Sequence, residues 1–160
     1  RLTPSMQRIA CPERDDWRAT AEQTGFDFHT IDGERYWDER AYYAFSLDEI
    51  ERQIEAPTGE IDAMCLELVG HAIDDERTLR RLKIPEAFWP LISASWHRDE
   101  ASLYGRLDLS FDGRGPAKLL EYNADTPTSI FEAAVVQWTW LEQAIARRII
   151  PARRPVQLDP

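Results

Sequence analysis

The sequence is poor in the residues that make cross-linked or membrane-embedded proteins. Only two of its 160 residues are cysteines, Cys11 and Cys65, so a disulfide framework is excluded and a reducing compartment is expected. No apolar run approaches the roughly 18 residues of a membrane-spanning helix, and no signal peptide is visible. The composition therefore predicts a cytoplasmic protein with no membrane partner.

Positive charge is also scarce. Lysine and arginine number 19 against 29 aspartates and glutamates, which leaves a net charge of −10. An acidic chain of this kind repels phosphate backbones, so we expect no general binding of nucleic acids. The acidity suits a polyamine as a partner, although it equally serves ordinary solubility.

Several familiar catalytic patterns are missing as well. The sequence contains no Gly-rich phosphate loop, no nucleophile elbow and no Cys–His zinc pattern. The three histidines, His29, His71 and His97, do not have the short spacing of metal ligands. We therefore expect each of them to be a structural or surface residue.

What the sequence does contain is enough apolar material for one packed domain. Hydrophobic residues make up 43% of the chain and aromatic residues 11%, including six tryptophans, which argues against disorder. The chain begins at Arg1 and ends with a run from Arg153 to Pro160. Both ends are expected to lie inside a longer protein.

Hydrophobic periodicity predicts an α+β protein in which helices pack on a small antiparallel sheet. Helices are expected at residues 13–23, 46–55, 60–73, from Pro85 onward and at 129–148, and strands at residues 26–31, 34–37, 102–110 and 117–123. Pro57 is expected to interrupt or kink the chain between the second and third helices.

Capping residues indicate where these helices begin, and apolar stripes indicate which of their faces are buried. Ser46 with Glu49 predicts a capping box. Ser129 or Thr128 is expected to be the N-cap of the last helix, with Glu132 as the capping-box partner of Ser129. Two stripes at helical spacing are expected to be buried: Ile61, Met64, Cys65, Leu68 and Val69 in one helix, and Ile130, Ala133, Ala134, Trp138, Leu141 and Ile145 in the other. Cys65 is thus interpreted as a core thiol.

The second predicted hairpin carries the most informative polar pattern. Arg106 and Asp108 are two residues apart and share one face of the first strand. Glu121 and Asn123 share a face of the second strand, and Asp125 joins them if that strand continues. Polar side chains therefore line one side of both strands.

The loop at residues 112–116 sets the register of this hairpin. A turn centred in it places Asp108 opposite Glu121 and Arg106 opposite Asn123, with facing side chains about 5 Å apart. Facing carboxylates call for a cation, either the arginine or a metal, and carboxylates with an amide oxygen suit Mg²⁺. Spacing alone leaves three interpretations open: a solvated polar face with one ion pair, a phosphate-handling metal site, or general acid–base carboxylates.

The segment after the hairpin leads into the last predicted helix. Thr126, Thr128 and Ser129 place hydroxyl groups where a helix begins. Free N–H groups at a helix N-terminus attract carboxylates and phosphates. These hydroxyls are therefore candidates for holding an acidic substrate.

Two blocks of sequence around the hairpin have a distinctive order. Residues 104–108 read YGRLD and residues 121–129 read EYNADTPTS, with further characteristic runs at residues 25–30, 36–39, 41–43, 64–66 and 131–138. Together these runs resemble the glutathionylspermidine synthase family across residues 8–151. The chain is most similar to the stand-alone synthetase-like branch, which lacks an amidase domain.

This resemblance implies an ATP-grasp-type fold and a ligase that joins a carboxylate to an amine. In such a ligase ATP phosphorylates the carboxylate, and the amine then displaces phosphate from the acyl phosphate. The implied cofactor is Mg²⁺, with ATP as a substrate. The implied partners are a small-molecule or peptide carboxylate and an amine such as a polyamine.

The resemblance also suggests roles for individual residues. Arg106 resembles the arginine that steadies the transferring phosphoryl group. The residues that resemble Mg²⁺ ligands are Asp108, Glu121 and Asn123. Thr126 and Thr128 stand where bifunctional members have serines that hold glutathione, so the hydroxyls are kept and methyl groups are added.

Synthetase domains of the resembled family are more than twice as long as this chain. Residues 1–160 are therefore expected to form the N-terminal portion, with the remainder of the ATP-grasp domain absent from the sequence. Because no phosphate-cradling loop is present, the chain alone is expected to be inactive. The alternative is a non-catalytic module that keeps the fold and binds a peptide or polyamine.

Overall fold

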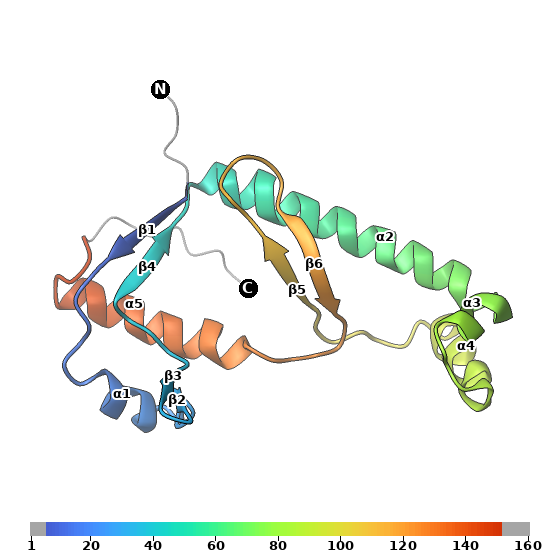
Figure 1. Ribbon diagram of the computed structural model, residues 1–160, viewed down its shortest axis with the longest axis horizontal. Coiled ribbons are helices and arrows are strands. Elements are labelled where there is room, and N and C mark those ends of the chain that lie inside the picture. The colour runs from blue at the N-terminus through green and yellow to red at the C-terminus, as the bar shows by residue number, and fades with distance from the viewer. Residues whose placement is uncertain (1–5, 152–160) are drawn as a thin grey trace. The chain divides into compact units, whose positions relative to one another are not determined.

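The computed structural model describes residues 6–151 and divides the chain into two compact units (Figure 1). Described residues of Arg1–Glu49 and Pro127–Pro160 form the first unit, and Ile50–Thr126 form the second. The described strands make three two-stranded antiparallel sheets, which confirms the α+β prediction. None of the described helices is both long enough and apolar enough to cross a membrane.

The first unit combines two short sheets with helices from both ends of the chain. Its elements are β1 (Gln7–Ala10), α1 (Trp17–Gln23), β2 (Thr30–Ile31), β3 (Glu34–Arg35), β4 (Ala41–Ala44), a π-helical segment η3 (Glu132–Val136) and α5 (Gln137–Ala146). Strands β1 and β4 pair antiparallel, with Arg8 opposite Tyr43. The rings of Tyr42 on β4 and Trp140 on α5 lie 5.8 Å apart, which packs the helix against the strand.

An aromatic cluster forms the centre of this unit. Phe26 is fully buried beside Ala21 of α1 and Val136 of η3. Trp37 and Phe131 pack their rings edge-on against Phe26, at centroid distances of 5.8 and 6.1 Å. The core therefore joins segments that are more than a hundred residues apart in the sequence.

The first predicted hairpin is confirmed, but its strands are only two residues long. Asp32 and Gly33 have φ angles of 51° and 83°, the left-handed pair that a tight two-residue hairpin requires. Strand β2 begins at Thr30 and not at Phe26, because the Phe26 side chain is buried in the core. His29 is also buried and contacts the Trp17 ring edge-on, in agreement with a structural role.

Helix α1 begins at Trp17 and not at residue 13 as predicted. Glu13 and Arg14 are held by ion pairs with Arg35 and Glu39, which keep the chain out of the helix. The helix ends as expected, since Gly25 follows it with a φ of 85°.

The last helix departs most from the prediction. Residues 132–136 form a π-helical turn, which adds a residue per turn and rotates the face of everything after it by about 100°. The predicted stripe is therefore wrong: Ile130 and Trp138 are more than a third exposed, whereas Val136 and Ala144 are buried.

The second predicted capping box is wrong for Ser129, whereas Thr128 as the N-cap stays a prediction. Ser129 has a left-handed φ of 69° where an N-cap residue has an extended backbone. Glu132 accepts a hydrogen bond from the Tyr36 hydroxyl at 2.7 Å.

The second unit is built on one long helix. Its elements are η1 (Glu49–Glu55, π-helical), α2 (Ala56–Ala72), α3 (Glu76–Arg81), η2 (Glu86–Phe88), α4 (Trp89–His97), β5 (Arg106–Ser110) and β6 (Lys118–Asn123), with the first residue of η1 assigned to the other unit. The helix after Pro85 and the second hairpin are therefore confirmed. The hairpin lies alongside α2 (Figure 1).

The start of the long helix follows the predicted capping box. The Ser46 hydroxyl accepts from the Glu49 N–H at 3.2 Å, and the Glu49 carboxylate accepts from the Ser46 N–H at 2.8 Å. Pro57 does not separate two helices, because the change from π- to α-helical hydrogen bonding falls at this point. Pro57 lies in the first α-helical turn, where a missing N–H is tolerated.

The apolar stripe predicted on α2 is not buried. Met64 and Leu68 are 60% and 65% exposed, and α2 has no buried residue among its seventeen. The covered side of α2 carries instead Asp62 and Gly70, which meet Tyr122 of β6 and Trp96 of α4. Cys65 is half-buried, so the prediction of a core thiol is wrong.

Candidate functional site

The predicted polar pattern occupies the paired region of β5 and β6. Arg106 lies opposite Asn123, and Asp108 lies opposite Glu121, as the loop length predicts. The register shifts by one residue beyond Asp108, where Leu109 pairs with Leu119. The four polar residues therefore lie on the regular side of a β-bulge.

A line of polar contacts joins these four side chains. Arg106 Nε donates to Asp108 Oδ1 at 3.1 Å. With the Asn123 amide oriented to satisfy both neighbours, its nitrogen donates to Glu121 Oε1 at 3.0 Å and its oxygen accepts from Arg106 at 3.2 Å. Arg106 is thus the cation that the facing carboxylates require.

The donor set fits a hard divalent cation. Among residues 6–151, no three His, Cys, Asp or Glu side chains gather in a way that could hold a metal. A site here would consist of Asp108, Glu121 and the Asn123 amide oxygen, with water and phosphate oxygens as its other ligands, which is the usual coordination of Mg²⁺. The Asp108 side chain is 43% exposed, so a metal–phosphate complex can reach it.

Asp125 does not extend this face, because the strand does not continue to it. Strand β6 ends at Asn123, and Asp125 has a left-handed φ of 50°. Its carboxylate accepts from the N–H groups of Leu103 and Tyr104, at 2.7 and 3.2 Å, and these bonds lower its pKa. The same contacts divert residues 102–105 from the pairing, which explains why β5 begins at Arg106 and not at residue 102.

The two predicted substrate-binding threonines belong to different units. Thr126 ends the second unit, and its hydroxyl donates to the Ala124 carbonyl at 3.4 Å. Thr128 lies in the first unit. Their joint role with an acidic substrate stays a prediction.

The opposite face of the hairpin is attached to helix α2. Tyr122 stands between Glu121 and Asn123 in β6, and its hydroxyl donates to Asp62 Oδ1 at 2.7 Å. This hydrogen bond, together with burial, raises the pKa of Tyr122 to about 12. Alternation along the strand places Tyr122 on this face, but nothing local in the sequence indicates Asp62 as its partner.

A second attachment lies at the turn of the hairpin. The Ala117 N–H donates to the Gln53 carbonyl at 2.7 Å, and the Gly115 N–H donates to the Gln53 side chain at 3.2 Å. Gln53 belongs to the π-helical segment η1, so a single residue of this segment holds the turn through both its backbone carbonyl and its side chain.

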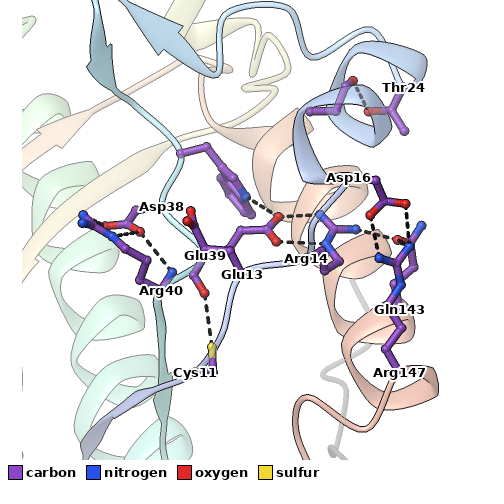
Figure 2. Close-up of polar contacts among 12 residues, drawn as sticks. Cys11, Glu13, Arg14, Asp16, Thr24, Asp38, Glu39, Arg40, Gln143 and Arg147 are labelled. Atoms are coloured by element: carbon purple, nitrogen blue, oxygen red, sulfur yellow. Dashed lines mark hydrogen bonds and ion pairs between the residues drawn. The ribbon is translucent and has the colours of Figure 1, made fainter.

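A polar network lies inside the first unit (Figure 2). Arg14 and Glu39 form an ion pair in which both residues are 3% exposed or less. Gln143 accepts from Arg14 at 2.8 Å (Figure 2). The Trp37 indole donates to Glu39 at 3.0 Å. The network continues outward through Arg147, which donates to Gln143 at 3.1 Å and pairs with the exposed Asp16. Because the Arg14–Glu39 pair itself is buried, we interpret the network as structural. The sequence reasoning missed it, since the pair is 25 residues apart with no local pattern.

Comparison with known proteins agrees with the hairpin motif. Residues 8–153 match the family described as glutathionylspermidine synthase preATP-grasp. The chain belongs to this family. The resemblance stated from the YGRLD and EYNADTPTS blocks is therefore confirmed, and the α+β fold is consistent with a preATP-grasp domain.

Three relatives are named as ligases or synthetases, and one of these is also named as an amidase. The chain is 43% identical over 142 residues to a Haemophilus influenzae protein named "Putative acid--amine ligase", covering 86% of this chain and 35% of that protein. It is 32% identical over 104 residues to the bifunctional glutathionylspermidine synthetase/amidase of Escherichia coli, covering 64% and 17% of the two chains.

A third relative is the trypanothione synthetase of Crithidia fasciculata, 33% identical over 78 residues, which are 48% of this chain and 12% of that protein. The chain therefore spans about a third or less of the length of these relatives. Membership of a ligase family is shown, and the activity of the whole protein is a separate question.

Proposed function

We propose that this chain is the N-terminal portion of an ATP-dependent acid–amine ligase. The reaction transfers the γ-phosphoryl group of ATP to a carboxylate, and an amine then attacks the acyl carbon while phosphate leaves. The observation that supports this most is the opposed pair Asp108 and Glu121, with Arg106 and Asn123 beside them. Arg106 offsets the repulsion between the two carboxylates, and the exposed pair suits the charge of a metal–phosphate complex.

Each residue of the hairpin has a specific task in this proposal. Asp108, Glu121 and Asn123 would hold Mg²⁺, which neutralises phosphate oxygens when it is bound. Arg106 would orient the transferring phosphoryl group and stabilise its charge in the transition state. Asn123 would release the Arg106 guanidinium as its amide oxygen turns to the metal.

The substrate classes follow from the relatives and from charge. Names of the relatives point to glutathionylspermidine and trypanothione as products of those proteins. For this chain we propose a small-molecule or peptide carboxylate, held by Thr126 and Thr128, and an amine such as a polyamine. The net charge of −10 favours a cationic amine over an anionic one. We place the reaction in the cytoplasm, where free cysteines are stable.

The test is ATP-dependent phosphate release by the intact protein that carries this chain. The protein is incubated with ATP, Mg²⁺ and a matrix of thiol peptides against polyamines, and amide products are identified by mass spectrometry. Release that requires both an acid and an amine supports the ligase. Tight binding of a peptide or polyamine with no turnover for any pair would favour the non-catalytic module instead.

A further inference from the structure

The contact between Tyr122 and Asp62 lies directly behind the proposed metal site. Tyr122 separates the two β6 residues that would hold the metal, and its side chain points to the other face of the strand. Its hydroxyl reaches α2 at 2.7 Å. Tyr122 cannot contact the metal from this face, so any effect of Tyr122 on metal binding passes through the backbone of β6.

Gly105 completes the contact. A Cβ atom at this position would lie 2.5 Å from Cε2 and 2.8 Å from the hydroxyl oxygen of Tyr122, closer than real Cβ contacts allow. Gly105 does not have a positive φ, so the requirement for glycine is one of space and not of backbone conformation. The residue directly precedes Arg106, which links the fit of the tyrosine ring to the start of β5.

We propose that Gly105, Tyr122 and Asp62 form a clamp that positions the metal-binding face of the hairpin, an inference that rests on the function proposed above. An isolated two-stranded hairpin is marginally stable and free to twist. The clamp holds its open end on α2, while Gln53 holds its turn. Two attachment points along one rigid helix fix the orientation of β6, and with it the spacing of Glu121 and Asn123.

The Tyr122 hydroxyl is tested by measuring Mn²⁺ binding to the intact protein, with electron paramagnetic resonance detecting the free ion. We expect Tyr122→Phe to raise the Mn²⁺ dissociation constant about threefold to tenfold, less than the roughly tenfold to hundredfold of groups bonded directly to metal ligands, because Tyr122 acts through the strand. Tyr43→Phe is the matched control, since Tyr43 is a 56% exposed tyrosine of β4. It should leave the constant unchanged.

Variants of Asp62 separate positioning from general stability. Asp62→Ala should weaken Mn²⁺ binding as Tyr122→Phe does. Asp62→Asn should bind Mn²⁺ about as well as the native protein does, because its amide oxygen still accepts from the tyrosine hydroxyl. All constants are measured well below the melting temperature of each variant, so that loss of folded protein does not contribute.

Gly105 is tested by a double-mutant cycle. Gly105→Ala should weaken Mn²⁺ binding at least tenfold in the native background. In the Tyr122→Leu background the same change should have little further effect, because the ring that the new methyl group strikes is gone. Additive effects of the two substitutions would overturn the clamp.

Mn²⁺ binding by Glu121→Gln and by Tyr122→Phe distinguishes failure of the clamp from failure of the metal site itself. If Glu121→Gln weakens Mn²⁺ binding and Tyr122→Phe does not, the clamp is wrong and the metal site stands. If Glu121→Gln leaves Mn²⁺ binding unchanged, the metal site is wrong, and the clamp has nothing to position.

Discussion

Asp108 of β5 and Glu121 of β6 lie directly opposite each other across an antiparallel strand pair. Two like charges in this position destabilise a hairpin unless a cation accompanies them. Arg106 provides one, donating to Asp108 at 3.1 Å and to the Asn123 amide at 3.2 Å. Arg106 thereby offsets this repulsion without a metal, and the carboxylates remain accessible to one.

Glu121→Gln should reduce the ligase rate of the intact protein at saturating Mg²⁺ by roughly a hundredfold or more, because it removes a charge that a divalent ion needs. Thermal stability without Mg²⁺ should change little or increase, since a like-charge contact is relieved. Glu60→Gln, at an exposed position of α2, is the control. A normal rate would contradict the metal assignment, whereas lost rate with a strongly destabilised protein would make Glu121 a structural partner of Arg106.

Glu39→Gln should lower the free energy of unfolding by about 3–5 kcal/mol, because it leaves the buried Arg14 guanidinium without its countercharge. The double variant Arg14→Met with Glu39→Leu should lower the free energy of unfolding much less than Glu39→Gln or Arg14→Met alone. Urea denaturation measures all three variants. Glu100→Gln, which breaks the exposed pair with Arg98, should have little effect. Equal losses at the buried and exposed pairs would contradict the structural role assigned to the network.

Glu49 should make stability depend on pH. The N–H of Ser46, then that of Met6, and the Ser46 hydroxyl donate to its carboxylate and lower its pKa below the ordinary 4.5. The stabilisation is therefore complete above pH 4.5 and is lost as the pH falls through the lower folded-state pKa. Melting temperatures between pH 6 and 3 should fall less steeply in Glu49→Gln than in the native protein. Equal slopes would show that the carboxylate is not held in this way.

The 160-residue chain alone should not hydrolyse ATP measurably, because its sequence contains no loop that cradles phosphates. The assay is phosphate release by the purified chain, with the Glu121→Gln chain prepared in parallel to reveal contaminating ATPases. Turnover that disappears in the variant would show that the nucleotide site lies within these residues.

The sequence by itself determined the features that depend on residues close together in the chain. Alternation along both strands and a short Gly-containing loop were sufficient to predict that Asp108 faces Glu121. The capping box of Ser46 and Glu49 was predicted in the same way, because its partners are three residues apart. Local hydrogen bonds and side-chain alternation operate over a few residues, so their outcome can be inferred without the rest of the protein.

Only the tertiary structure decided which faces are covered and which distant groups meet. The π-helical turn at residues 132–136 moved the buried face of the last helix, and α2 meets the hairpin through Asp62 instead of its apolar stripe. Arg14 finds Glu39 across 25 residues, and Tyr122 finds Asp62 across 60. Such contacts depend on how whole elements pack, because burial is a property of the assembled surfaces and not of the spacing within one segment.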